Sequence, residues 1–273
     1  MSVSATQPKR VIAIDFDDVA AQTTLQTMKL FNHVFGYDLT KYRVPVRAAV
    51  DTDACGVIEV KQKMQQLAAA CPLPGHEREP VPGMVLAFQR LKDLGYQLHI
   101  VTSRADSHRE TLTKWFEEAG VSVGPGKLIE DMWFTGGLGA SPEEAQELNK
   151  EMLEEWRLNY TKQSGGEKKL RQSTTQLCQA IGASILVDDQ YGNFPPMLEN
   201  SDIHCLLFGD YAWNQNDIDF SDPADLLSHA ERQEQGLVLA KRDIKEGGRL
   251  KRVKDWKEVV EFVEKLEKAT SRG

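Results

Sequence analysis

Four apolar residues followed at once by three carboxylates, in the stretch VIAIDFDDV at residues 11–19, constrain the fold of this chain more than any other feature. The run VIAI is mostly β-branched and predicts a short strand buried on both faces, as in a parallel sheet. Parallel sheets present their functional groups at the carboxyl ends of the strands, so we expect Asp15 and Asp17 at the rim of a sheet. Two like charges on alternate residues repel each other unless a cation lies between them or one carboxyl is protonated. The pattern therefore predicts a nucleophilic aspartate beside an acid–base aspartate, with a hard divalent metal ion bound to both.

An aspartate after a strand is also a common turn residue and helix N-cap. The spacing Asp-x-Asp alone occurs often by chance. The functional interpretation of Asp15 and Asp17 therefore depends on matching chemistry at the ends of other strands.

Length and composition describe an ordinary globular protein. A chain of 273 residues can bury a full core, as one domain with an insertion or as two domains. The net charge of -8 argues against a nucleic-acid polymer or an anionic membrane as the main partner. A small anionic substrate stays compatible with this charge, because a bound metal ion can dominate the field inside a cleft. The oligomeric state stays open.

The cysteines give no sign of disulfides or of a cysteine metal site. They have neither CxxC pairing nor metal-type spacing, which fits a reducing compartment, and they are Cys55, Cys71, Cys178 and Cys205. The first ten residues contain no apolar core of signal-peptide length, and no later run is long enough to span a bilayer. We therefore expect a cytoplasmic protein, with the nucleus as the alternative.

The rest of the chain alternates between strands and helices. We expect strands at 11–14, 96–101, 127–134, 184–187 and 203–208, and helices at 20–34, 57–71, 82–94, 107–118, 141–160, 167–181 and 253–266. Ser107 is the expected N-cap of its helix, and Gly36, Gly95, Gly120 and Gly182 are the expected helix stops. Such alternation predicts an α/β fold with a doubly wound parallel sheet.

Residues 20–81 interrupt this alternation with helices and no clear strand. We therefore expect a flexible tail at 1–10, an α/β core at 11–19 and 82–273, and a small helical cap at 20–81. The long helix at 141–160 is highly charged, which favours a solvated face over an interaction arm.

Polar groups follow three of the expected strands. The first ends in Asp15 and Asp17, the second in Thr102 and Ser103, and the fourth in Asp188 and Asp189. In a right-handed parallel sheet these three ends can lie on one edge. Two pairs of carboxylates with a hydroxyl nearby make a site for Mg²⁺ and a phosphoryl group.

In these motifs, VIAIDFDDV, HIVTSR and ASILVDD, the chain resembles the haloacid dehalogenase superfamily, over about residues 11–210. The resemblance implies a Rossmann-like core and a Mg²⁺-dependent phosphatase. By the family's pattern, Asp15 is the nucleophile that forms an aspartyl-phosphate, and Asp17 protonates the leaving oxygen and then activates water. The metal ligands are Asp15, Asp17 through its backbone carbonyl, Asp188 and Asp189.

The resemblance also implies a phosphate-binding group. Thr102 through its hydroxyl and Ser103 through its N–H would hold the phosphate. The family's lysine has no counterpart at its usual place, which Thr174 occupies, so Lys169 or Lys168 is the candidate. If no lysine reaches the site, Mg²⁺ and Arg104 would neutralise the charge of the phosphoryl group.

The short cap after the first strand, with VTS, FTG and DD, resembles the 5'-nucleotidase and deoxyribonucleotidase branch, including fungal-type members. The resemblance implies a small phosphorylated metabolite as substrate, a nucleotide among the candidates. Asp18 stands where that branch has glycine, which puts the cap hinge and the nucleotide specificity in question. Cap residues that could meet a leaving group are His33, Arg43 and Arg47.

Two other classes stay open. The departure at Thr174 favours a binding or regulatory protein that keeps the fold with little or no turnover. A receiver-like phosphoacceptor would also gather acidic residues and a threonine at strand ends. It ranks last, because its phosphorylated aspartate follows the third strand, which here ends in Thr135-Gly136.

Overall fold

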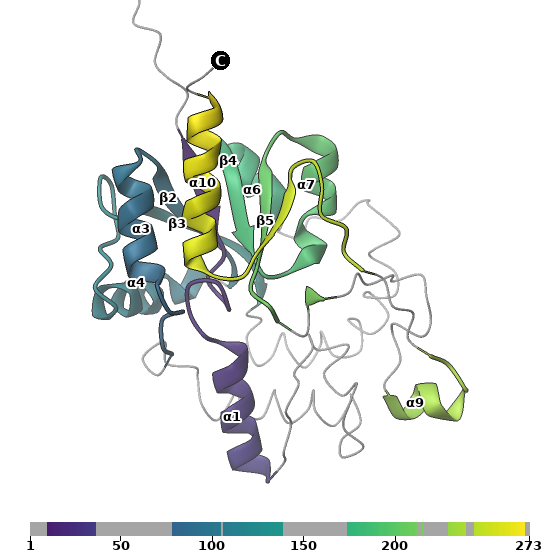
Figure 1. Ribbon diagram of the computed structural model, residues 1–273. Coiled ribbons are helices and arrows are strands. Elements are labelled where there is room, and N and C mark those ends of the chain that lie inside the picture. The colour runs from purple at the N-terminus through teal and green to yellow at the C-terminus, as the bar shows by residue number, and fades with distance from the viewer. Residues whose placement is uncertain are drawn as a thin grey trace, which may run out of the picture.

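The protein is built on one six-stranded parallel sheet. A computed structural model describes residues 10–36, 78–104, 106–138, 174–211, 214–215, 229–238 and 243–270. The strands lie in the order β3-β2-β1-β4-β5-β6, and every neighbouring pair is parallel (Figure 1). Their bounds are β1 Val11–Ile14, β2 Gln97–Arg104, β3 Ile129–Leu138, β4 Ala183–Asp188, β5 His204–Phe208 and β6 Leu250–Val253. The expected doubly wound α/β fold is confirmed.

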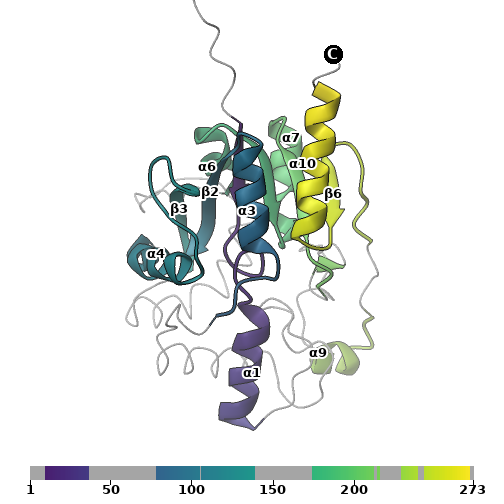
Figure 2. The ribbon, with the colours of Figure 1, turned by 60° about the vertical axis from the view of Figure 1, so that its left-hand side comes forward.

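Helices connect these strands and cover both faces of the sheet (Figures 1 and 2). The α-helices are α1 Thr24–Phe35, α3 Met84–Asp93, α4 Arg109–Glu118, α6 Thr174–Ala180, α7 Pro195–Asn200, α9 His229–Glu234 and α10 Trp256–Thr270. Two short 3-10 helices are η2 Asp106–His108 and η3 Tyr191–Asn193. None of the helices described in the structure combines the length and the apolar character needed to cross a bilayer.

The strand β1 is buried on both faces, as its unbroken apolar sequence predicts. Ile12 and Ile14 belong to a core shared with α3, α4 and α10. Val11 and Ala13 belong to a second core, shared with α6 and α7. Alternate side chains of a strand point to opposite faces, so four apolar residues in a row supply two layers of core.

The C-terminal helix α10 ties the sheet to the loop that follows β1. Trp256 is 1% exposed and packs edge-on against Phe88 of α3, with ring centroids 5.0 Å apart. Its indole Nε1 donates to the carbonyl oxygen of Val19 at 3.0 Å. The last helix therefore holds in place the chain directly after the aspartates.

Several expected boundaries are wrong. The sequence predicted a helix from Val253, but Val253 ends the strand β6, which has only four residues and lies at the sheet edge, and α10 begins at Trp256. Ser107 is not an N-cap, because η2 precedes α4 and the N-cap position is His108, with no capping hydrogen bond from its side chain. The strand β3 continues to Leu138, beyond the expected end at Phe134.

The helix expected from Ala20 begins later, at Thr24. The intervening residues pair instead with a distant segment: Val81 N–H donates to the Ala20 carbonyl at 2.8 Å, and Gln22 N–H donates to the Glu79 carbonyl at 2.9 Å. The outgoing and returning chains therefore run side by side at residues 20–22 and 79–81. The helix α1 extends from this crossing, away from the sheet (Figures 1 and 2).

Two expected helices, at 57–71 and 141–160, lie outside the described residues. The helix expected at 167–181 is described only from Thr174 onward, as α6. All four expected helix stops have positive φ angles, a conformation open to glycine at little cost: 70° at Gly36, 87° at Gly95, 83° at Gly120 and 69° at Gly182.

Candidate active site

Three carboxylates meet where the sheet changes its winding direction. The strand β1 lies between β2 and β4, so the connections leave it on opposite sides, and a crevice forms at such a point in a parallel sheet. Asp15 directly follows β1, and its N–H donates to the Val187 carbonyl of β4 at 2.9 Å. Asp188 ends β4, and Asp189 follows it. One carboxylate oxygen from each of Asp15, Asp188 and Asp189 lies within 4.8 Å of the other two.

The surroundings of this cluster disfavour negative charge. Burial raises the pKa of Asp15 well above its ordinary value, and the charges of Asp188, Asp17 and Asp189 raise it further. Burial also raises the pKa of Asp188 to about 6. This rise persists although the Asp188 carboxylate accepts hydrogen bonds from the N–H of Gln190 and from the amide of Asn193, each at 2.7 Å. A bound divalent cation would offset the repulsion between these carboxylates.

The set fits a hard cation in ligand type, number and orientation. Carboxylate oxygens are the ligands that Mg²⁺ prefers, and it keeps waters at its other positions. The two hydrogen bonds to Asp188 fix the direction of that carboxylate, as outer contacts commonly do for metal ligands. Asp15, Asp188 and Asp189 are therefore the residues that could hold Mg²⁺.

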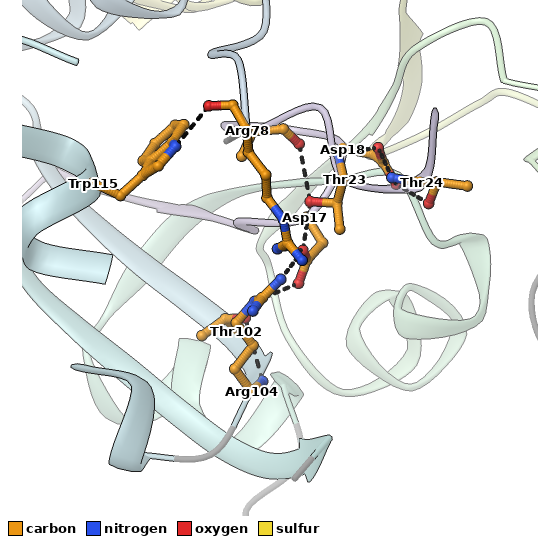
Figure 3. A network of polar contacts seen from close by, with 9 residues as sticks. Asp17, Asp18, Thr23, Thr24, Arg78, Thr102, Arg104 and Trp115 are labelled. Atoms are coloured by element: carbon orange, nitrogen blue, oxygen red, sulfur yellow. Dashed lines mark hydrogen bonds and ion pairs between the residues drawn. The ribbon is translucent and has the colours of Figure 1, made fainter. Parts of the chain in front are cut away.

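Asp17 has a different environment from the other aspartates (Figure 3). Arg104 donates to both of its carboxylate oxygens, from Nε to Oδ2 at 2.9 Å and from Nη2 to Oδ1 at 2.6 Å. The Thr23 hydroxyl donates to Oδ1 at 2.6 Å, and Nη1 of Arg78 lies 3.4 Å from the same oxygen. Burial alone would raise the pKa of Asp17, but the charge and hydrogen bonds of Arg104, with smaller contributions from Arg78 and Thr23, lower it.

Asp18 has a backbone conformation that most residues other than glycine avoid. Its φ angle is 59°, in the left-handed region, where aspartate is among the more acceptable residues other than glycine. Its carboxylate accepts hydrogen bonds from the N–H groups of Thr23 and Thr24, each at 2.9 Å, and from the Thr24 hydroxyl. It thus binds the backbone at the start of α1. Burial raises its pKa to about 6 against the opposing effect of these donors.

Two hydroxyl-bearing residues of β2, Thr102 and Ser103, lie next to the segment 15–18 that carries the aspartates. Ile14 of β1 pairs with Ile100 of β2, so Thr102 lies two residues farther along, beside the chain that follows Ile14. Thr102 is 1% exposed, and its hydroxyl accepts a hydrogen bond from the N–H of Arg104 at 3.4 Å. Ser103 is half-buried.

The structure does not place the remaining expected site residues at the aspartates. His33 is exposed near the end of α1. Lys168, Lys169, Arg43 and Arg47 lie outside the described residues.

Several site residues carry no recognisable signal in the sequence. Arg78 lies 61 residues from Asp17 along the chain, in a segment with no motif. Tyr211 follows β5, and its hydroxyl donates to the Asp18 carbonyl at 2.7 Å. Gln190 and Asn193, which donate to Asp188, come shortly after β4, and this closeness in sequence to the acidic pair is their only signal.

Comparison with known proteins gives a weak likeness to solved hydrolases. No family model and no curated protein matches the chain. A haloacid dehalogenase-like family hydrolase from Xanthomonas campestris is 12% identical, with a TM-score of 0.46 over 98% of this chain and 100% of that one. A candidate phosphoglycolate phosphatase from Lactobacillus delbrueckii subsp. bulgaricus is 12% identical, with a TM-score of 0.47 over 94% and 99%. Likenesses at these scores do not assign the chain to a family, and its function has to be inferred from the geometry of its own site.

Proposed function

We propose that the protein is a Mg²⁺-dependent hydrolase of small phosphomonoesters, with Asp15 as the nucleophile. The observation that carries this proposal is the meeting of Asp15, Asp188 and Asp189 within 4.8 Å. They meet at the end of the sheet where the buried hydroxyl of Thr102 also lies. Carboxylates with a hydroxyl nearby supply a nucleophile, metal ligands and a contact for a phosphoryl oxygen.

In this reaction the carboxylate of Asp15 attacks the phosphorus atom in line with the leaving oxygen. The bond from phosphorus to the leaving oxygen breaks, and an aspartyl-phosphate forms on Asp15. Water then attacks this phosphorus, which releases inorganic phosphate and restores the carboxylate. Bound Mg²⁺, held by Asp15, Asp188, Asp189 and the carbonyl of Asp17, would neutralise charge on the carboxylates and phosphoryl oxygens. The Thr102 hydroxyl and the Ser103 N–H would hold those oxygens.

Asp17 suits one half of its proposed role better than the other. Its paired, ionised carboxylate can accept a proton from the attacking water. To protonate the leaving oxygen in the first step it must carry a proton, which the ion pair with Arg104 opposes. Arg104 must therefore move or weaken its contact when substrate binds.

This constraint favours a second candidate function. A protein that binds Mg²⁺ and a phosphorylated metabolite with little or no turnover would keep Asp17 paired with Arg104. Binding of Mg²⁺ without phosphate release across a broad panel of phosphomonoesters, nucleotides included, would support this alternative.

The deciding experiment measures hydrolysis of 4-nitrophenyl phosphate with Mg²⁺. Asp15→Asn should abolish turnover and leave the circular dichroism spectrum unchanged. Asp131→Asn is the matched control, because Asp131 is on β3 and its carboxylate pairs with Arg109, outside the cluster. Equal rates in wild type and Asp15→Asn would rule out the proposed mechanism.

A further inference from the structure

Arg78 is a buried cation with few partners. Its side chain is 5% exposed, and its contact with Asp17 spans 3.4 Å from Nη1 to Oδ1. Its Nη2 atom is buried and has no hydrogen-bond partner among the described residues. A guanidinium carries five N–H donors, and leaving a buried charged donor unpaired is unfavourable. The side chain therefore has unused capacity to bind an oxygen ligand.

The backbone of Arg78 is nevertheless held firmly. Nε1 of Trp115, on α4, donates to the Arg78 carbonyl at 2.8 Å (Figure 3). The next residue, Glu79, accepts the N–H of Gln22 through its carbonyl at 2.9 Å. These main-chain contacts fix the backbone from which the Arg78 side chain extends to Asp17.

A second guanidinium lies at the same carboxylate. Arg104 binds both oxygens of Asp17, and its Cζ lies 5.1 Å from the centroid of the Phe16 ring. Burial and then the charge of Arg104 lower the pKa of Arg78 to about 10, which agrees with two cations in close proximity. Two positive charges therefore share the single negative charge of Asp17.

We propose that Arg78 and Arg104 together bind an oxyanion group of the ligand, for which the Asp17 carboxylate stands in. The group is either the phosphoryl group itself or a second anionic group on the leaving-group side. Planar guanidinium forks suit both, because phosphate and carboxylate each offer paired oxygen acceptors. That the ligand is a substrate rests on the proposed function, but binding of the oxyanion does not require turnover.

The test measures binding of three ligands that the protein cannot hydrolyse. Calorimetry with Mg²⁺ present compares inorganic phosphate, ethylphosphonate and 2-carboxyethylphosphonate. In Arg78→Gln, a tenfold or larger loss of affinity for all three ligands would identify the phosphoryl group as the bound oxyanion. A loss confined to 2-carboxyethylphosphonate would identify a second anionic group. Unchanged affinity for all three ligands would overturn the proposal.

Control variants separate binding from a structural role of Arg78. Arg90→Gln should bind all three ligands as the wild type does, because Arg90 pairs with Glu264 and its side chain is 52% exposed. Arg78→Lys keeps the charge but loses the fork, so its affinity should fall between those of wild type and Arg78→Gln. If Arg78→Gln lowers the melting temperature but not the affinities, Arg78 is only a structural brace, and the proposal is wrong.

The outcome is independent of whether the protein is a phosphatase. If wild type releases no phosphate from any phosphomonoester but Arg78→Gln weakens ligand binding, the proposed function is wrong and oxyanion binding by Arg78 and Arg104 is supported. If wild type is an active phosphatase and Arg78→Gln binds the three ligands normally, the proposed function is supported and oxyanion binding by Arg78 and Arg104 is ruled out.

Discussion

Arg104 forms a bidentate ion pair with Asp17, with Nε 2.9 Å from Oδ2 and Nη2 2.6 Å from Oδ1. Such a bidentate contact is stronger and more directional than a single hydrogen bond. It separates the two aspartates of the Asp-x-Asp motif: Asp15 lies with other carboxylates, whereas Asp17 lies with cations. The same motif therefore holds two carboxyl groups whose pKa values shift in opposite directions.

Removing the Arg104 guanidinium should raise the pKa of Asp17. We expect this increase in Arg104→Gln, because the charge and the hydrogen bonds of Arg104 hold the Asp17 pKa down. The carboxyl carbon of Asp17, followed by ¹³C NMR as a function of pH, measures the change directly. If ionised Asp17 activates water, the acidic limb of the pH–rate profile should also move to higher pH. Arg109→Gln is the control, since Arg109 pairs with Asp106 and Asp131. An unchanged Asp17 titration in Arg104→Gln would contradict the ion pair.

Neutralising Asp188 should weaken Mg²⁺ binding. We expect Asp188→Asn to lose about tenfold or more in affinity, because it removes one charged ligand of three. Wild-type affinity should also fall as the pH is lowered through about 6, where Asp188 takes up a proton that competes with the metal ion. Calorimetric titrations with Mg²⁺ on either side of this pH measure both effects. Equal affinity in Asp188→Asn and wild type would exclude Asp188 as a ligand, and Asp131→Asn should behave as wild type.

The sequence predicted the fold well because the fold depends on local patterns. The apolar run at 11–14 and the glycines that end helices are read from neighbouring residues, and each strand's carboxyl end has a fixed place in a parallel sheet. The nearness of Asp15 to Asp188 agrees with the expectation that the carboxyl ends of their strands can lie on one edge of the sheet. The strand β6 was missed because it is short and lies at an edge, where Lys251 is exposed and breaks the apolar run.

The contacts of Asp17 could not be predicted in the same way. Arg78 reaches Asp17 across 61 residues, and its position depends on the crossing of residues 20–22 and 79–81 and on the indole of Trp115. Such contacts arise from tertiary packing and leave no periodic pattern in the sequence. The left-handed backbone of Asp18 was likewise not predicted, because an aspartate in the sequence gives no sign of a positive φ.

Substitutions of Asp18 should separate its backbone conformation from its hydrogen bonds. Asp18→Ala keeps the positive φ and loses the bonds to Thr23 and Thr24, so we expect a loss of about 2–3 kcal/mol in unfolding free energy. Asp18→Gly loses the same bonds but relieves the backbone, and it should be about 1 kcal/mol more stable than Asp18→Ala. Urea denaturation measures the difference. If the alanine variant is the more stable of the two, the left-handed conformation is not present in solution.

The charge of Asp18 should also make stability depend on pH. Its pKa is about 6 in the folded protein and about 4 in an unfolded chain, so the folded state binds the proton more tightly. This contribution is fully present below about pH 4 and is lost as the pH rises through about 6, by up to about 3 kcal/mol. Asp18→Asn should remove it, so the variant should lose less stability than wild type between these pH values. Identical pH dependence of the unfolding free energy in the two proteins would show that Asp18 titrates normally.

Gly209 should be required for stability, because the ring of Tyr211 occupies the space that a β-carbon at this position would need. A Cβ built at Gly209 would meet the Tyr211 ring atoms at less than van der Waals distance, and the φ angle of 83° adds strain for any other residue. In Gly209→Ala the ring must therefore move, and the hydrogen bond from its hydroxyl to the Asp18 carbonyl is lost. We expect a loss of about 2–3 kcal/mol in unfolding free energy from the backbone strain and the lost bond together.

Two variants divide the effect of Gly209→Ala into its parts. Gly182→Ala has a similar φ angle of 69° and no atom within 4 Å of the added carbon, so it carries the backbone strain alone. Tyr211→Phe loses only the hydrogen bond, at a cost of about 1 kcal/mol. Because the ring displacement adds to the strain, Gly209→Ala should be less stable than Gly182→Ala by about the cost of Tyr211→Phe or more. Equal stability of the two alanine variants in urea would mean that Tyr211 neither packs against Gly209 nor stabilises the backbone at Asp18 through its hydrogen bond.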